Sequence, residues 1–234
     1  MEYLARITLE HQGIQEILQV QKELNERLKK AKGVNIVHLD NTLRFWRDFL
    51  AQEHMSWEEE FAFALFRKLN HGLPERLQGD HERIKAALAN LEATIKPLRS
   101  GRPHSGREFV RWGEELTEAV TDHLARENTA LLGLKGQGET GQNLEFQPEG
   151  PPWDRVKHLV QVADELCQEY LQRASALRSL EENTVVVAET EEEAVDLEPV
   201  AAEAGGAEGP PDAEAAEVGE TNETGEFGEA GFLL

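Results

Sequence analysis

The stretch HMSWE at residues 54–58 places a histidine and a glutamate four residues apart. On an α-helix both side chains leave the same face, one turn apart. The same spacing recurs in HLARE at residues 123–127, and two further histidines, His11 and His81, lie in helical patterns of their own. Four helices that direct such ligands inward form a di-metal carboxylate site in a helix bundle. The first two-thirds of the chain is therefore predicted to be a bundle built around a metal site.

Apolar residues recur every three or four positions along five stretches, a spacing typical of amphipathic helices. His11 and His81 each occupy a position on such an apolar face. Glycine and proline residues separate the stretches and predict the turns between them. The predicted helices span residues 3–31, 36–70, 75–99, 105–135 and 153–182.

These patterns predict an all-α fold. Residues 1–135 are expected to form an up-down four-helix bundle, and residues 136–152, rich in Gly and Pro, a linker. Residues 153–182 are expected to form an additional amphipathic helix, which would pack on the flank of the bundle, cap one end of it, or meet a second subunit. The acidic tail at 183–234 has few large apolar residues and is predicted to be disordered.

Most of the formal net charge of -21 comes from the C-terminal end of the chain. Residues 181–234 hold 17 of the 45 acidic residues and none of the 24 Lys and Arg, so residues 1–180 hold 28 acidic and 24 basic residues. A strongly acidic protein is not expected to bind nucleic acid or an anionic membrane. The bundle itself is close to neutral.

A single cysteine, Cys167, excludes a disulfide within the chain and fits a reducing compartment. Because Cys167 lies on the apolar face of a predicted helix, we expect a buried and inert thiol. The N-terminus lacks the pattern of a signal peptide, and no stretch has the ~18 consecutive apolar residues of a membrane span. The predicted location is therefore the cytoplasm.

The up-down order can be tested on the sequence, because ligands on neighbouring antiparallel helices must lie equally far from the loop that joins them. His11 precedes the loop at 32–35 by about 20 residues, and the 54–58 pair follows that loop by a similar number, at ~1.5 Å per residue. His81 precedes the loop near residue 101 by about as many residues as the 123–127 pair follows it. The connection between the second and third helices fits less well, by roughly 9 Å, which an extended segment would have to span.

A lone histidine on an apolar face is usually a core residue with a satisfied hydrogen bond, and a His and Glu four apart often meet by chance. The shared layer favours a metal site, since burying six polar groups without one would cost several kcal/mol. The remaining histidines, His38, His71, His104 and His158, are expected on the surface. The predicted metal ligands are His11, His54, Glu58, His81, His123 and Glu127.

Imidazole nitrogens combined with bridging carboxylates favour iron over manganese or zinc. Six protein ligands shared by two iron ions leave open coordination positions, where O2, NO or peroxide would bind. Trp57, Phe61 and Ile84 are candidates for an apolar wall that limits water.

The motifs and their flanking residues resemble a hemerythrin-like, or HHE cation-binding, domain. The resemblance covers residues 1–135 and implies a four-helix bundle with a non-haem di-iron centre bridged by Glu58 and Glu127. The motifs that carry it are EHQGI at 10–14, HMSWEEE at 54–60, DHERI at 80–84 and HLARE at 123–127.

The chain departs from oxygen-carrying hemerythrins at two places. Lys85 stands where those proteins have a second histidine on the third helix, and Met55 follows His54 where a doubled histidine is common. The resulting set of four histidines and two glutamates is closer to the hemerythrin-like domains of iron-sensing F-box proteins, although nothing in the chain resembles an F-box. These differences argue against reversible carriage of O2.

Three functions remain open on the sequence. The first is a di-iron protein that binds O2, NO or iron for sensing, storage or carriage. The second is a di-iron oxidase, either a ferroxidase or a peroxide-reducing enzyme, and the third is a metal-free helical interaction module. The tail ends in the apolar Gly231–Leu234, a layout similar to the cargo peptides of hemerythrin-like proteins in encapsulin shells, so a protein partner or shell docked by the tail is a further hypothesis.

Overall fold

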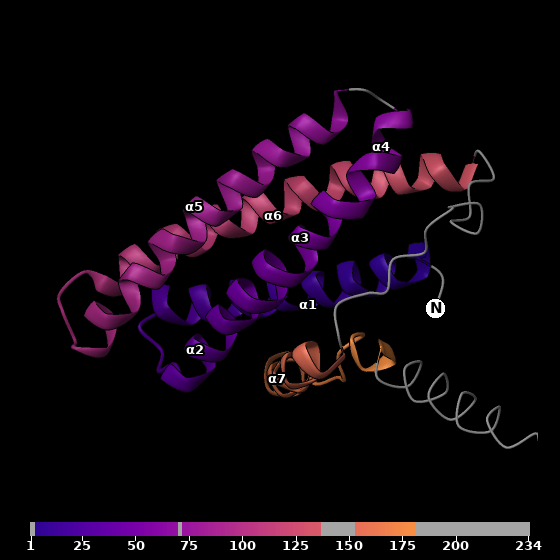
Figure 1. Cartoon of the computed structure of the whole chain (residues 1–234). Coiled ribbons are helices and arrows are strands. Elements are labelled where there is room, and N and C mark those ends of the chain that lie inside the picture. The colour runs from indigo at the N-terminus through magenta and orange to yellow at the C-terminus, as the bar shows by residue number, and fades with distance from the viewer. Residues whose placement is uncertain (1–2, 70–71, 137–152, 181–234) are drawn as a thin grey trace, which may run out of the picture. The chain divides into compact units, whose positions relative to one another are not determined.

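The computed structural model describes residues 3–69, 72–136 and 153–180, and within these ranges every regular element is helical (Figure 1). The predicted all-α class is confirmed. Three long helices are continuous: α1 (Tyr3–Lys29), α5 (Leu73–Arg99) and α6 (Ser105–Gly136). Helix α5 begins with Pro74 in its first turn, where the missing N–H of proline costs nothing.

The helix predicted at 36–70 is helical throughout its described part but changes its hydrogen-bond pattern. Two π-helical segments interrupt it, in which backbone N–H groups bond five residues back rather than four. The Met55 N–H donates to the Leu50 carbonyl, and the Phe63 N–H donates to the Glu58 carbonyl. In chain order the segments are α2 (Ile36–Arg44), η1 (Phe45–His54), α3 (Met55–Trp57), η2 (Glu58–Ala62) and α4 (Phe63–Leu69).

Side-chain pairs between these helices define their relative direction. In each pair of helices, residues later in one helix contact residues earlier in the other, so neighbouring helices run antiparallel. This is the sense that the predicted up-down order requires. Helices α1 and η1 are joined by Glu10–His54 and Gln21–Trp46, and α1 and α6 by His11–Asn128 and Lys29–Glu114. Arg47 of η1 pairs with Glu92 of α5, and Glu59 of η2 with His81 of α5. Helices α5 and α6 are joined by Asp80–Arg126 and Arg83–Asp122.

The apolar core of the bundle forms two clusters of buried residues. On α1, Ile7 belongs to the smaller cluster and Ile14 to the larger one. On α5, Leu77 and Ile84 are divided in the same way. The turn between the two clusters on each helix carries buried polar residues, so a polar layer lies between two apolar ones.

Helix α7 (Trp153–Leu171) packs against α1, α2 and η1, on the flank of the bundle. The sequence predicted a helix to residue 182, but α7 ends at Leu171. Gln172 has a left-handed backbone with φ of 56°, which ends the helical path. The following residues turn back, and the Ser175 N–H donates to Asp164 Oδ1 at 2.9 Å.

Glu16 of α1 holds this returning segment. Its buried carboxylate accepts hydrogen bonds from the Ser175 hydroxyl at 3.0 Å and from the Ala176 N–H at 2.8 Å. Arg173 adds an ion pair at 3.5 Å. Because Glu16 lies far away in the sequence, the periodicity of residues 153–182 could not reveal where the helix ends.

Cys167 lies on the buried face of α7, with no exposed surface. Burial and the nearby Glu16 carboxylate raise the pKa of its thiol to about 12. The thiolate is therefore almost absent at neutral pH, as expected for an inert structural cysteine.

The predicted linker falls almost wholly, and the predicted tail wholly, outside the described residues, as does His71. His104 and His158 are exposed, as predicted. His38 is half-buried instead, because its Nδ1 lies 2.8 Å from the hydroxyl of Tyr170 on α7. Among the described helices, none is long and apolar enough to cross a membrane.

Gly13 gives a direct test of the packing of the returning segment on α1. A Cβ at Gly13 would lie 2.3 Å from the Leu177 side chain, whereas a Cβ at the helical Gly79 meets nothing within 4 Å. Gly13→Ala should lower the free energy of unfolding by about 1–2 kcal/mol, since overpacking outweighs the gain in helix propensity. Gly79→Ala, the matched control, should raise it by about 0.5–1 kcal/mol. Urea unfolding measures both, and equal effects would contradict the packing.

Cys167 should not react with a thiol reagent in the folded protein at pH 8, because the thiol is buried and protonated. In urea it should react at the rate of an exposed cysteine. The measurement is the absorbance of the released chromophore over time. Rapid reaction without urea would show that α7 leaves the bundle readily.

Candidate metal centre

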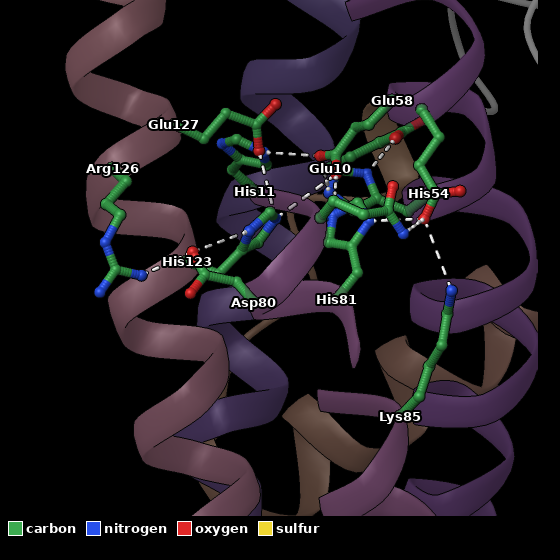
Figure 2. A network of polar contacts seen from close by, with 12 residues as sticks. Glu10, His11, His54, Glu58, Asp80, His81, Lys85, His123, Arg126 and Glu127 are labelled. Atoms are coloured by element: carbon green, nitrogen blue, oxygen red, sulfur yellow. Dashed lines mark hydrogen bonds and ion pairs between the residues drawn. The ribbon is translucent and has the colours of Figure 1, made fainter. Parts of the chain in front are cut away.

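The polar layer contains all six residues predicted as metal ligands, brought together from α1, the two π-helical segments, α5 and α6 (Figure 2). The structure excludes none of them from the cluster. Their exposed fractions are 2% for His11, 1% for His54 and 0% for Glu58, His81, His123 and Glu127.

Glu58 is the centre of the cluster, and its two oxygens divide the histidines into two pairs. Oε1 lies 2.6 Å from His54 Nε2 and 3.6 Å from His11 Nε2. Oε2 lies 3.1 Å from His81 Nε2 and 3.4 Å from His123 Nε2. A carboxylate with one oxygen toward each pair has the arrangement of a bridge between two cations.

Glu127 lies on the other side of the cluster. Its Oε2 is 3.1 Å from His11 Nε2 and 3.5 Å from His123 Nε2. Glu127 therefore faces one histidine of each pair.

The π-helical segments place the ligands of the second helix. His54 is the last residue of η1 and Glu58 the first of η2. Because a π turn contains more residues than an α turn, it advances less along the axis per residue. Together with the earlier start of α5 at Leu73, this reduces the mismatch that the sequence indicated at this connection.

The histidines are oriented by a surrounding ring of acceptors that face their Nδ1 atoms. His11 Nδ1 lies 2.8 Å from Asn128 Oδ1, His54 Nδ1 lies 2.8 Å from Glu10 Oε2, and His81 Nδ1 lies 2.7 Å from Glu59 Oε1. His123 Nδ1 lies 4.0 Å from Asp80 Oδ2. When Nδ1–H donates outward, Nε2 keeps its lone pair for the centre, which is the usual arrangement of metal-bound histidine.

Cations lie outside this ring of acceptors. Arg6 Nε donates to Glu10 at 2.8 Å, and Arg126 donates to Asp80 at 2.5 Å. Lys85 Nζ lies 3.5 Å from Glu59. These cations balance the outer carboxylates, so the layer does not accumulate uncompensated negative charge.

The ionisation of the cluster reflects burial and close opposite charges. Burial lowers the pKa of His11, but the Glu127 and Glu58 carboxylates outweigh it and raise that pKa to about 9. His54 behaves in the same way, and its pKa lies well above the usual value because of Glu58 and Glu10. Burial raises the pKa of Glu58, but the surrounding histidines hold it well below its usual range.

Glu127 differs from Glu58. Burial and then the negative charge of Glu58 raise the pKa of Glu127, and His11 offsets this only in part. A cation placed between the two carboxylates would remove this repulsion.

Several buried atoms of the cluster lie at ion-pair distance from one another but do not have the geometry of a hydrogen bond within the described part of the chain. Buried polar atoms in this state cost free energy, and each calls for a partner. Imidazole nitrogens and carboxylate oxygens converging in a dry layer fit a metal ion, and the donor set fits iron. The atoms are Nε2 of His11, His54 and His123, Nδ1 of His123, Oε1 of Glu58, and both oxygens of Glu127.

The donor atoms fall into two groups, each compact enough to surround one metal ion. The groups share Glu58. One consists of His11, His54, Glu58 and Glu127, and the other of Glu58, His81 and His123.

A family model described as the hemerythrin HHE cation binding domain matches residues 3–134. The chain belongs to the hemerythrin family. The resemblance predicted from the sequence motifs is thereby confirmed. Searches of the curated proteins and of the solved structures give no significant match.

The sequence analysis missed the outer acceptors of this hemerythrin domain. Glu10, Glu59 and Asp80 stand next to ligands in the quoted motifs, but adjacency alone did not show that they face an imidazole. Asn128 follows Glu127 and carried no signal, since a single asparagine on a helix is usually a surface residue. Of the three residues expected to form an apolar wall, Trp57 and Ile84 are buried and Phe61 is half-buried. The ring of Phe63, which was not expected there, stacks on His81 at a centroid distance of 5.5 Å.

Metal binding should stabilise the hemerythrin domain, because it supplies partners for the buried donors. Fe(II) added without oxygen should raise the thermal unfolding midpoint, by an amount that corresponds to ~2.7 kcal/mol at a hundredfold excess over Kd. Circular dichroism measures the midpoint, and a chelator should reverse the rise. The His54→Ala variant should lose most of the rise caused by Fe(II), and the Gly79→Ala variant should keep it. An unchanged midpoint would count against a metal site.

Proposed function

We propose that this hemerythrin-family protein is an up-down four-helix bundle, with an additional C-terminal helix, that holds a non-haem di-iron centre. Its ligands would be the six residues of the polar layer, and its role would be to bind O2, NO or iron for sensing, storage or carriage. One observation supports the proposal above all. Four histidine Nε2 atoms converge on a carboxylate that is completely buried and has one oxygen directed at each pair.

The protein residues would divide the work at this site. Glu58 would bridge the two iron ions, while Glu10, Asn128 and Glu59 keep the imidazole Nδ1 atoms turned outward. The buried ring of Phe63 beside His81 would limit water at the centre. Iron, when bound, would supply open coordination positions for a small ligand and a change of oxidation state.

The contacts of Lys85 support the expectation that the protein does not carry O2 reversibly. Its ammonium group pairs with Glu59 and Glu82 and does not reach the centre as a ligand. The four histidines would therefore be divided two and two between the iron ions. A di-iron oxidase, either a ferroxidase or a peroxide-reducing enzyme, is the alternative that the same ligand set would serve.

The cytoplasmic location and the role of the tail remain predictions. The apolar terminus Gly231–Leu234 at the end of an acidic segment is compatible with docking to a protein partner or an encapsulin-type shell. Deletion of residues 226–234 should then remove a co-purifying partner. Unchanged partners after the deletion would leave the tail as a solubilising segment.

The di-iron proposal predicts about two iron ions per chain after reconstitution with Fe(II) without oxygen. On exposure to air, charge-transfer absorption bands typical of a di-iron centre should appear. Metal analysis and absorption spectroscopy measure the two quantities. His54→Ala should abolish the bands, and Asp122→Ala, which removes a surface partner of Arg83, should keep them.

Removal of oxygen then separates the candidate roles. Bands that fade when oxygen is removed indicate a carrier or sensor. Bands that persist while Fe(II) or peroxide is consumed over many turnovers indicate an oxidase. Protein that folds but binds no stoichiometric iron would contradict the di-iron proposal and leave a helical binding module.

A further inference from the structure

The two compact groups of donors define two metal positions that are not equivalent. The first position is surrounded by His11, His54, Glu58 and Glu127, and the second by Glu58, His81 and His123. Glu58 contributes one oxygen to each position. The positions therefore differ in the number of protein donors around them.

The difference arises because the Glu127 carboxylate lies closer to the first position than to the second. Its Oε2 lies 3.1 Å from His11 Nε2 of the first position, against 3.5 Å from His123 Nε2 of the second. Its Oε1 forms no hydrogen bond in the described part of the chain, and Glu127 is not part of the compact group formed by Glu58, His81 and His123. The first position thus has four donors and the second has three.

The outer acceptors differ in the same direction. Both histidines of the first position have an Nδ1 partner at 2.8 Å, Asn128 for His11 and Glu10 for His54. In the second position the nearest acceptor to His123 Nδ1 is Asp80, at 4.0 Å, which is too long for a hydrogen bond. Within the described chain His123 Nδ1 has no hydrogen-bond partner.

Arg126 explains why Asp80 does not reach His123. The Asp80 carboxylate is paired with Arg126 Nη1 at 2.5 Å, and the Arg126 side chain is exposed (Figure 2). Arg126 also lines an open groove of about 520 Å³ together with Leu73 and Arg76. Asp80 therefore pairs with Arg126 and not with the imidazole of His123.

Exposure of the carboxylate acceptors follows the same division, whereas Asn128, the partner of His11, is half-buried. The Glu10 side chain, which supports the first position, is 3% exposed. The side chains of Glu59 and Asp80, which flank the second position, are 32% and 15% exposed. Water therefore competes for the two carboxylates that flank the second position more than for Glu10 at the first.

We propose that the two metal ions are held unequally, with a retained ion at the first position and an exchangeable ion at the second. The proposal rests on the di-iron function proposed above. Its physical basis is one donor fewer and one histidine without an outer hydrogen bond. Loss of an outer partner of a metal-bound histidine typically costs 10–100-fold in metal affinity.

Release of iron to a chelator tests the proposal on the full chain. The protein is loaded to two Fe(II) per chain without oxygen, and an absorbing ferrous chelator is added in excess. Iron should leave in two phases, each equal to one ion per chain, with the faster rate at least about tenfold above the slower. No variant is needed for this measurement.

Two variants assign the phases to positions. His81→Ala should remove the fast phase and leave about one slowly released iron ion per chain. Glu10→Ala should accelerate the slow phase by about 10–100-fold and leave the fast phase unchanged, because it removes the partner of His54. Asp122→Ala is the matched control, since it breaks another pair between α5 and α6 that does not touch a histidine, and both phases should persist.

The outcomes separate this proposal from the function on which it rests. Two iron ions that leave in a single phase would overturn the unequal positions and leave the di-iron centre intact. A slow phase that disappears in His81→Ala while the fast one remains would reverse the assignment and also overturn the proposal. A chain that binds no iron at all would contradict the di-iron function itself.

Discussion

The buried carboxylate of Glu58 is the constraint on which the rest of the structure depends. It has no exposed surface, so its charge must be balanced inside the protein. Nε2 atoms from four helical segments supply that balance within 3.6 Å. Each of these helices must therefore present one face at the same height in the bundle. Two apolar clusters, above and below this layer, fix that height by packing.

Charge alternates outward from this carboxylate, and the alternation explains how a polar layer is tolerated between two apolar ones. Imidazoles surround Glu58, acceptors such as Glu10 face their outer nitrogens, and cations such as Arg6 cover those acceptors. A buried charge with a partner on each side avoids most of the desolvation penalty that an isolated charge would incur. The weakest link is at His123, where Asp80 turns toward Arg126 instead.

Helix α1 joins the polar layer to the flank of the protein. One face of α1 carries His11, and another carries Gly13 and Glu16, which receive the segment that follows α7. Packing on both faces restricts rotation and sliding of α1 and so fixes the position of its ligand. The additional helix thus contributes to the centre without providing a ligand.

The sequence by itself determined the helices and the faces on which His11, His54, His81 and His123 lie. A hydrophobic period of three to four residues and an i,i+4 spacing are local properties, which any helix preserves whatever its neighbours are. The matching distances to the loops also followed from the sequence, because the rise of an α-helix is nearly constant. For these reasons the cluster and the family could be predicted from motifs alone.

Only the tertiary structure decided which side chains support the histidines, where the π turns fall and where α7 ends. Asn128 and Asp80 face imidazoles of other helices only because the helices pack at particular rotations. The π turns depend on which carbonyl each N–H finds, and the apolar pattern does not encode that choice. The end of α7 depends on Glu16, a carboxylate from a distant helix that captures Ser175. The supports of the histidines and the end of α7 result from contacts between residues far apart in the chain, which no local pattern records.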